Sequence, residues 1–141
     1  MLKQPKKSKF NKLQKIRIKS LNRSVLYLTK NNTENGKIVA LQNSKLNQRQ
    51  IHAFKETLLK NLKRKKNKVI SSIFPDLTVT RKPLGSRMGK GKGSTDFLCT
   101  KIYKGAVIFS ICGNFKLSSS AKGLCQKLPF LTKFVQKNAF S

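Results

Sequence analysis

The sequence predicts an α+β fold built mainly on an antiparallel sheet. Short β-prone runs outnumber helical ones along the 141 residues, and most of them are joined by turns that suit hairpins. The 38% apolar fraction is enough for one modest core. We therefore expect a single α+β domain over residues 21–141, preceded by a basic extension over residues 1–20.

The basic extension contains the run KQPKKSKFNKLQKIRIK and has no acid. Transit peptides share such a composition. Cationic arms of this kind commonly become ordered only against RNA phosphates. The arm residues that we expect to bind RNA are Lys6, Lys7, Lys9, Lys12, Lys15 and Arg17.

Two β-prone runs open the domain, at Ser24–Thr29 and Lys37–Leu41, and Asn35-Gly36 between them is a good signal for a hairpin that pairs the two runs. An amphipathic helix is then predicted over Gln48–Lys65. Asn47 is a suitable N-cap, and apolar residues follow at spacings of three and four. These apolar residues are Ile51, Phe54, Leu58 and Leu62. Cations at the end of the helix, among them Lys63 and Arg64, suit its negative pole and can also reach phosphates.

The remaining elements are shorter. Strands are expected at Val69–Phe74, Leu77–Thr80, Phe97–Tyr103, Ala106–Cys112 and Lys133–Gln136, and a weaker helix at Ser118–Lys127, interrupted by Gly123. A tight turn at Lys104-Gly105 joins two of the strands, which favours a hairpin.

Charge is the dominant feature of the composition. Lysine and arginine number 32 against 4 acids, for a net charge of +28. The possible anionic partners are nucleic acid, a membrane surface or an acidic protein. The cations run through segments patterned as strands and helices, whereas a membrane tether would gather them on one helix or beside a lipidated residue. Nucleic acid is therefore the favoured partner.

No metal, cofactor or catalytic site is expected. Cys99, Cys112 and Cys125 form no CxxC pair, and His52 is the only histidine, so the four ligands of a zinc site are not in evidence. With one histidine and four acids, no nucleophile–base arrangement is apparent either, and the chain is not expected to be an enzyme.

The distinctive segment is RKPLGSRMGKGKGST, residues 81–95. It holds four glycines and five cations and no acid. The spacing fits neither the phosphate-binding GxxxxGK[ST] pattern nor the dinucleotide pattern GxGxxG. Alternating glycine and lysine instead combines a flexible backbone with positive charge, which suits a phosphodiester chain. A mobile surface loop is the alternative. The candidate RNA-binding residues are Arg81, Lys82, Arg87, Met88, Gly89, Lys90, Gly91, Lys92 and Gly93.

The run KPLGSRMGKGKG, with FPD before it, resembles the signature KPLxxRMGKGKG of the large-subunit ribosomal protein sixteen family. The similarity continues in order along the chain. MLKQPKKSKFNK resembles the family start, which argues that the N-terminus is mature protein. LNQRQIHAF resembles the first-helix motif, IYKGAVIFSICG a strand-turn-strand, and KLPFLTKFV the closing strand.

The chain departs from the family pattern at a few places. Lys104 stands where proline is usual, Ser110 replaces an acid, and Leu98 replaces an aromatic residue. The segment Asn114–Gln126 is shorter than the second helix of the family, which puts the length and packing of that helix in question. The basic loop is intact.

The resemblance implies an α/β-hammerhead-like fold, with two helices on one face of the sheet and a protruding loop. It also implies a structural protein that binds large-subunit rRNA near the peptidyl-transferase centre, with the loop reaching toward tRNA. The expected partners are rRNA, tRNA transiently and neighbouring large-subunit proteins, with no membrane and no homo-oligomer.

The sequence leaves open the cellular origin of the chain and a choice between competing functions. Lysine greatly outnumbers arginine, which suggests an AT-rich genome. A mitochondrial ribosome fits this best, with a bacterial cytoplasm or a plastid as alternatives. The competing functions are a basic RNA-binding or assembly protein that acts away from the mature ribosome and a membrane-active cationic polypeptide.

Overall fold

The structure is a computed structural model that describes residues 9–14, 17–18, 36–62, 67–89, 91–113 and 120–136. Its strands are β1 (Gly36–Ala40), β2 (Ser44–Asn47), β3 (Lys68–Ser71), β4 (Leu77–Arg81), β5 (Ser94–Ile102), β6 (Val107–Cys112) and β7 (Thr132–Gln136). Its helices are α1 (Gln48–Asn61) and α2 (Ser120–Cys125). The α+β class is confirmed.

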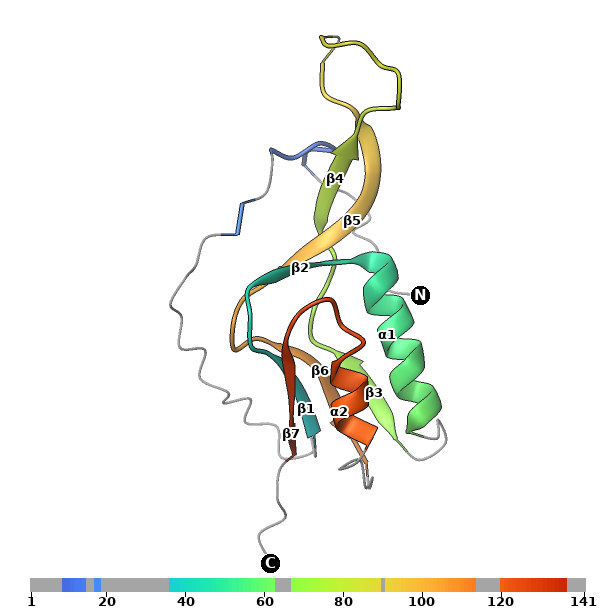
Figure 1. The fold of residues 1–141 in the computed structure, drawn as a ribbon, viewed down its shortest axis with the longest axis vertical. Helices are drawn as coiled ribbons and strands as arrows, with labels where there is room; N and C mark the ends of the chain where they lie inside the picture. Colours follow the sequence, from blue (N-terminus) through green and yellow to red (C-terminus); the bar gives the residue numbers. More distant parts are fainter. Residues whose placement is uncertain are drawn as a thin grey trace, which may run out of the picture.

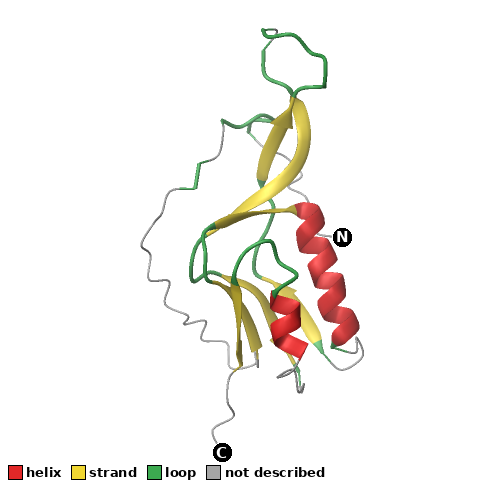
Figure 2. Ribbon diagram, viewed as in Figure 1, coloured by secondary structure: helices red, strands yellow, loops and turns green. Residues whose placement is uncertain are grey.

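The strands form two antiparallel sheets. One has the order β3-β6-β1-β7 and the other the order β2-β5-β4. Both helices cover the same face of the four-stranded sheet, while the β4–β5 hairpin of the three-stranded sheet is long and twisted and extends beyond them (Figures 1 and 2). The two-helix arrangement that the resemblance implies is therefore confirmed.

Helix α1 begins where the sequence predicts and for the predicted reason. The backbone N–H of Asn47 donates to Oε1 of Gln50 at 3.0 Å, which is one half of a capping box. Ile51, Phe54 and Leu58 are buried on one face of the helix. The helix ends at Asn61, and residues 63–65 of the expected longer helix lie outside the described residues.

The core lies between the helices and the four-stranded sheet. Phe54 from α1 meets Phe109 from β6, with ring centroids 5.3 Å apart and ring planes tilted by 36°. Ile38, opposite Phe109 in the β1–β6 register, lies in the same cluster. Leu124, Leu128 and Phe130 from α2 and the segment after it are buried in this cluster too. Ordinary apolar burial thus anchors both helices.

The expected hairpin between Ser24–Thr29 and Lys37–Leu41 is wrong. Strand β1 has β6 on one side and β7 on the other, so both of its hydrogen-bonding edges are already occupied. The segment Ser24–Thr29 lies outside the described residues. A turn-prone dipeptide predicts a change of direction, but the partner of the strand depends on which edge packs best across the whole sheet.

The turn at Lys104-Gly105 exists, but it does not close a hairpin. Strands β5 and β6 belong to different sheets, and the turn carries the chain from one to the other. The N–H of Gly105 donates to the carbonyl of Ala40 at 2.7 Å, and the N–H of Lys104 donates to Oδ1 of Asn43 at 2.6 Å. These bonds join the turn to the end of β1 and to the β1–β2 link, where the chain also passes from one sheet to the other.

Several element ends differ from expectation. Strand β3 ends at Ser71 rather than Phe74, and strand β5 begins at Ser94, earlier than expected, because it pairs with β4 up to the loop. The weak second helix is confirmed in a shortened form, Ser120–Cys125. The final strand is confirmed, and it pairs with β1.

Candidate RNA-binding surface

The signature segment caps the β4–β5 hairpin. Residues 82–93, here called the Gly-Lys loop, connect the two strands, and Arg81 pairs with Ser94 where the loop begins and ends. Figure 1 shows the loop projecting beyond both helices, at the far end of the molecule from the four-stranded sheet. The fold thus presents the loop away from the core.

The Gly-Lys loop is cationic and solvated. Every described residue from Arg81 to Lys92 is exposed, and Gly93 is half-buried. The loop contains no acid, and the nearest acid in sequence is Asp96, which is also exposed. Cations without carboxylate neighbours could not be buried in the protein's own core at acceptable cost. Their exposure leaves them available to an external anion.

Glycine is required where the loop closes. At Gly93, a Cβ would overlap the backbone carbonyl of Arg81 and lie 2.8 Å from the backbone nitrogen of Lys82. Only the missing side chain lets the two ends of the loop approach so closely. At the tip, Gly89 and Gly91 have φ values of 94° and 76°, which side-chain-bearing residues rarely adopt.

One loop cation has an internal role. The Nζ of Lys82 donates to the carbonyl of Gly89 at 2.6 Å, which ties the start of the loop to its tip. A lysine ammonium has three N–H donors, so Lys82 can make this bond and still contact a phosphate. The bond narrows the range of shapes that the loop samples.

Part of the basic arm lies against the loop. The Nζ of Lys12 donates to the carbonyl of Lys92 at 3.0 Å, and the Nζ of Lys92 donates to the carbonyl of Leu13. Figure 1 shows this blue segment beside the upper end of β4. Sequence reasoning expected the arm to order only against RNA. That expectation stays a prediction. The structure adds a contact that the sequence did not indicate, in which the loop supplies one acceptor, the Lys92 carbonyl, and one donor, the Lys92 ammonium.

The predicted contact residues are thus brought together only in part. The described arm cations Lys9, Lys12 and Arg17 are exposed, as are the described loop cations. Lys9 lies over its neighbour Phe10, with Nζ 5.7 Å from the ring centroid. The predicted residues outside the described ranges are Lys6, Lys7, Lys15, Lys63, Arg64 and Lys90.

Sequence reasoning missed Leu84. Its side chain is 94% exposed on the Gly-Lys loop, and Met88, which was predicted, is also fully exposed. A large apolar residue next to Pro83 in a cationic loop was the available signal, because such a residue has no core to enter. Apolar side chains held in this way can pack on nucleobases or sugars.

A chain with these features matches a known family. A model of the family described as ribosomal protein L16p/L10e matches residues 5–135. The chain belongs to this ribosomal protein family. The large ribosomal subunit protein uL16 of Paracoccus denitrificans is 36% identical over 136 residues, which cover 95% of this chain and 96% of that protein. The uL16 of Buchnera aphidicola is 35% identical with the same coverages, and that of Azorhizobium caulinodans is 38% identical, covering 96% and 98%.

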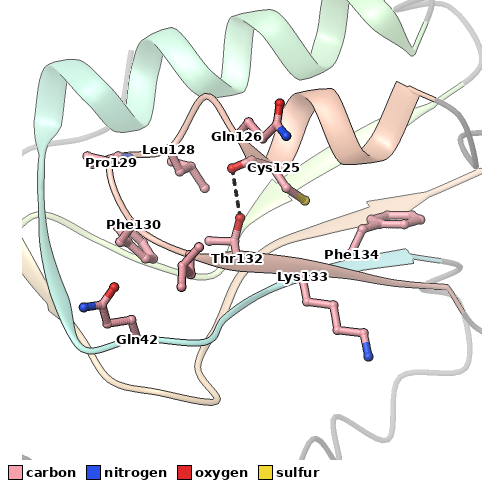
Figure 3. Close-up of a pocket in the computed structure, with 10 residues that line it drawn as sticks. Gln42, Cys125, Gln126, Leu128, Pro129, Phe130, Thr132, Lys133 and Phe134 are labelled. Atoms are coloured by element: carbon pink, nitrogen blue, oxygen red, sulfur yellow. Dashed lines mark hydrogen bonds between the residues drawn. The ribbon is translucent and has the colours of Figure 1, made fainter.

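A groove is the second surface feature of the described residues. A groove of about 840 Å³ lies between the end of α2 and β7, lined largely by apolar side chains such as Phe130 and Phe134 (Figure 3). Its wall is fastened by Thr132, whose hydroxyl donates to the carbonyl of Cys125 at 3.2 Å. Among the described residues that line it, Lys133 and Cys125 are the ones with ionisable side chains, so this part of the groove offers little for acid–base chemistry.

The cysteines and the histidine are dispersed. Across the described residues, no three His, Cys, Asp or Glu side chains form a group that could hold a metal ion. Burial raises the pKa of the Cys99 thiol, with Lys45 opposing the shift, so this cysteine is a poor nucleophile at neutral pH. Within the described ranges, neither helix is long and apolar enough to cross a lipid bilayer.

Replacing Gly93 with alanine should lower the free energy of unfolding by about 1–3 kcal/mol, because the new Cβ forces the two ends of the loop apart. Urea unfolding followed by circular dichroism measures this. Gly123→Ala is the matched control: nothing lies within 4 Å of the added Cβ, and alanine in α2 should raise stability by roughly 0.5–1 kcal/mol. Equal unfolding midpoints for Gly93→Ala and the unmodified chain would contradict the close approach.

Proposed function

We propose that this protein is a structural constituent of the large ribosomal subunit and that its Gly-Lys loop and basic arm bind large-subunit rRNA. The observation that carries the proposal is the exposed loop without acids at the end of a hairpin that projects from the core. Membership of the L16p/L10e family supports the ribosomal part of the assignment. The uL16 relatives, named as large-subunit proteins, support the choice of subunit.

The finer proposal concerns the position of the loop. We propose that the protein lies near the peptidyl-transferase centre, as the resemblance of its loop to the family implies. There the loop would reach toward tRNA and support tRNA positioning and late assembly. A loop that extends beyond the helices has the reach for this (Figure 1). The proposed RNA contacts are Lys6, Lys7, Lys9, Lys12, Lys15, Arg17, Lys63, Arg64, Arg81, Lys82, Arg87, Met88, Gly89, Lys90, Gly91, Lys92 and Gly93.

The proposed partners are large-subunit rRNA, tRNA transiently and neighbouring large-subunit proteins, with no membrane and no homo-oligomer. The relatives named above are bacterial, which favours a bacterial-type ribosome and the bacterial cytoplasm. The mitochondrial assignment keeps only its compositional basis, the excess of lysine over arginine.

Sedimentation tests the proposal. A tagged chain should co-sediment with large subunits in moderate salt, and its affinity for them should fall steeply as salt increases. Each phosphate contact contributes roughly 0.7–0.9 to the slope of log K against log salt. Recovery in RNA-containing fractions that lack large subunits would favour an assembly factor acting away from the ribosome. A slope worth only about one or two contacts would contradict an RNA-embedded protein.

A further inference from the structure

The basic arm and the Gly-Lys loop are joined by two hydrogen bonds that run in opposite directions. Lys12 donates to the loop at the Lys92 carbonyl, and Lys92 donates to the arm at the Leu13 carbonyl. The residues joined are 80 and 79 positions apart in sequence. We call this pair of bonds the arm–loop clasp. It lies next to the closing point of the loop, since Lys92 precedes the sterically constrained Gly93.

The clasp concentrates positive charge. Both ammonium groups donate to neutral carbonyl oxygens rather than to carboxylates, so neither charge is neutralised by these bonds. Two cations held at one junction repel each other, and an anion placed between them relieves the repulsion. Each ammonium also retains two further N–H donors, which suit the oxygens of a phosphate group.

The clasp is weak without a ligand. All of the side chains that form it are exposed or half-buried, and an exposed hydrogen bond contributes little net stability. Both bonds close the same contact between arm and loop, so losing one frees the arm and removes most of the benefit of the other. An anion that contacted both lysines would therefore close the arm on the loop and order both segments together.

We propose that the arm and the loop form one composite site for RNA phosphodiesters, with Lys12 and Lys92 as the positioning residues that join its halves. This rests on the proposed function and deepens it, because the two basic segments then bind RNA cooperatively instead of as separate contacts. Lys9 and Arg17, the other predicted arm cations that the structure describes, would then take their position relative to the loop from the clasp.

A double-mutant cycle tests the proposal. Lys12→Met, Lys92→Met and the double variant are compared with the unmodified chain for binding to large subunits stripped of their own copy of the family protein, across a range of salt. Each single variant should bind about 3- to 10-fold more weakly. For each single variant, the slope of log K against log salt should also fall by more than the roughly 0.7–0.9 that one phosphate contact contributes. The double variant should bind within about threefold of the weaker single variant.

The controls separate the clasp from simple charge loss. Lys60→Met removes one exposed cation from α1, away from the loop, and should leave binding unchanged. Lys12→Arg and Lys92→Arg keep a charged donor and should restore affinity. Strictly additive losses, each worth one contact, would overturn the composite site. So would single-variant losses no larger than that of Lys60→Met.

The same large subunits also show whether rRNA or tRNA supplies the phosphodiesters. If rRNA supplies them, the cycle shows its coupling on stripped subunits without tRNA. If tRNA supplies them, coupling appears only when tRNA binding to reconstituted subunits is measured. Coupling in neither assay overturns the proposal. If the unmodified chain fails to bind the subunits at all, the proposed function fails instead, so the two failures are distinguishable.

Discussion

Replacing Phe54 or Leu58 with alanine is expected to lower the free energy of unfolding by about 2–5 kcal/mol. Both side chains are buried on the inner face of α1, and Phe54 packs against Phe109 at the centre of the core. Truncation leaves a cavity that the surrounding sheet cannot fill, because β6 is held between two neighbouring strands. Urea unfolding in moderate salt, which screens the net charge, measures the loss.

Lys60→Ala is the matched control on the same helix. Its side chain is exposed, so the substitution should change stability by no more than about 0.5 kcal/mol. If Phe54→Ala were as stable as Lys60→Ala, the face of α1 that is assigned to the core would be wrong.

Replacing Lys90 and Lys92 with alanine is expected to do the reverse. The free energy of unfolding should change by less than about 0.5 kcal/mol, because the described part of the loop is solvated. Affinity for stripped large subunits should fall by about 3- to 10-fold for each cation, since charge-assisted hydrogen bonds to phosphates are lost. In cells, late subunit assembly or tRNA accommodation should be impaired.

Arg49→Ala combined with Lys60→Ala removes the same charge from exposed positions of α1 and serves as the control. It should reduce binding much less, because long-range attraction is screened over about 10 Å at moderate salt. The loop has been given the wrong function if its double variant unfolds the free domain while ribosome activity in complemented cells stays normal.

Helix α1 and the Gly-Lys loop were predictable because their causes are local. The Asn47 cap and the spacing of Ile51, Phe54 and Leu58 are sufficient to predict the helix, and they appear as expected. The exposure of the described part of the loop follows from its cations, which have no acid in the loop to pair with. In both cases the residues of a short stretch of sequence are sufficient for the prediction.

The topology was not predictable because its causes are distant in sequence. Strand β2 has the sequence SKLN, with a single buried apolar residue, and it exists because it pairs with β5. The division of β5 and β6 between two sheets depends on bonds from the Lys104-Gly105 turn to the β1–β2 link. The arm–loop clasp joins residues that are 80 and 79 positions apart in the sequence, and no local pattern predicts it.

Cross-linking from the loop tip tests the central claim most directly. Met88 is fully exposed, so a photoreactive residue placed there should leave the fold intact. After incorporation into large subunits and irradiation, the account predicts covalent links to RNA, with few or none from the same group placed at Lys60 on α1. Links from position 88 to protein alone, with RNA links absent, would contradict the assignment of the loop to RNA.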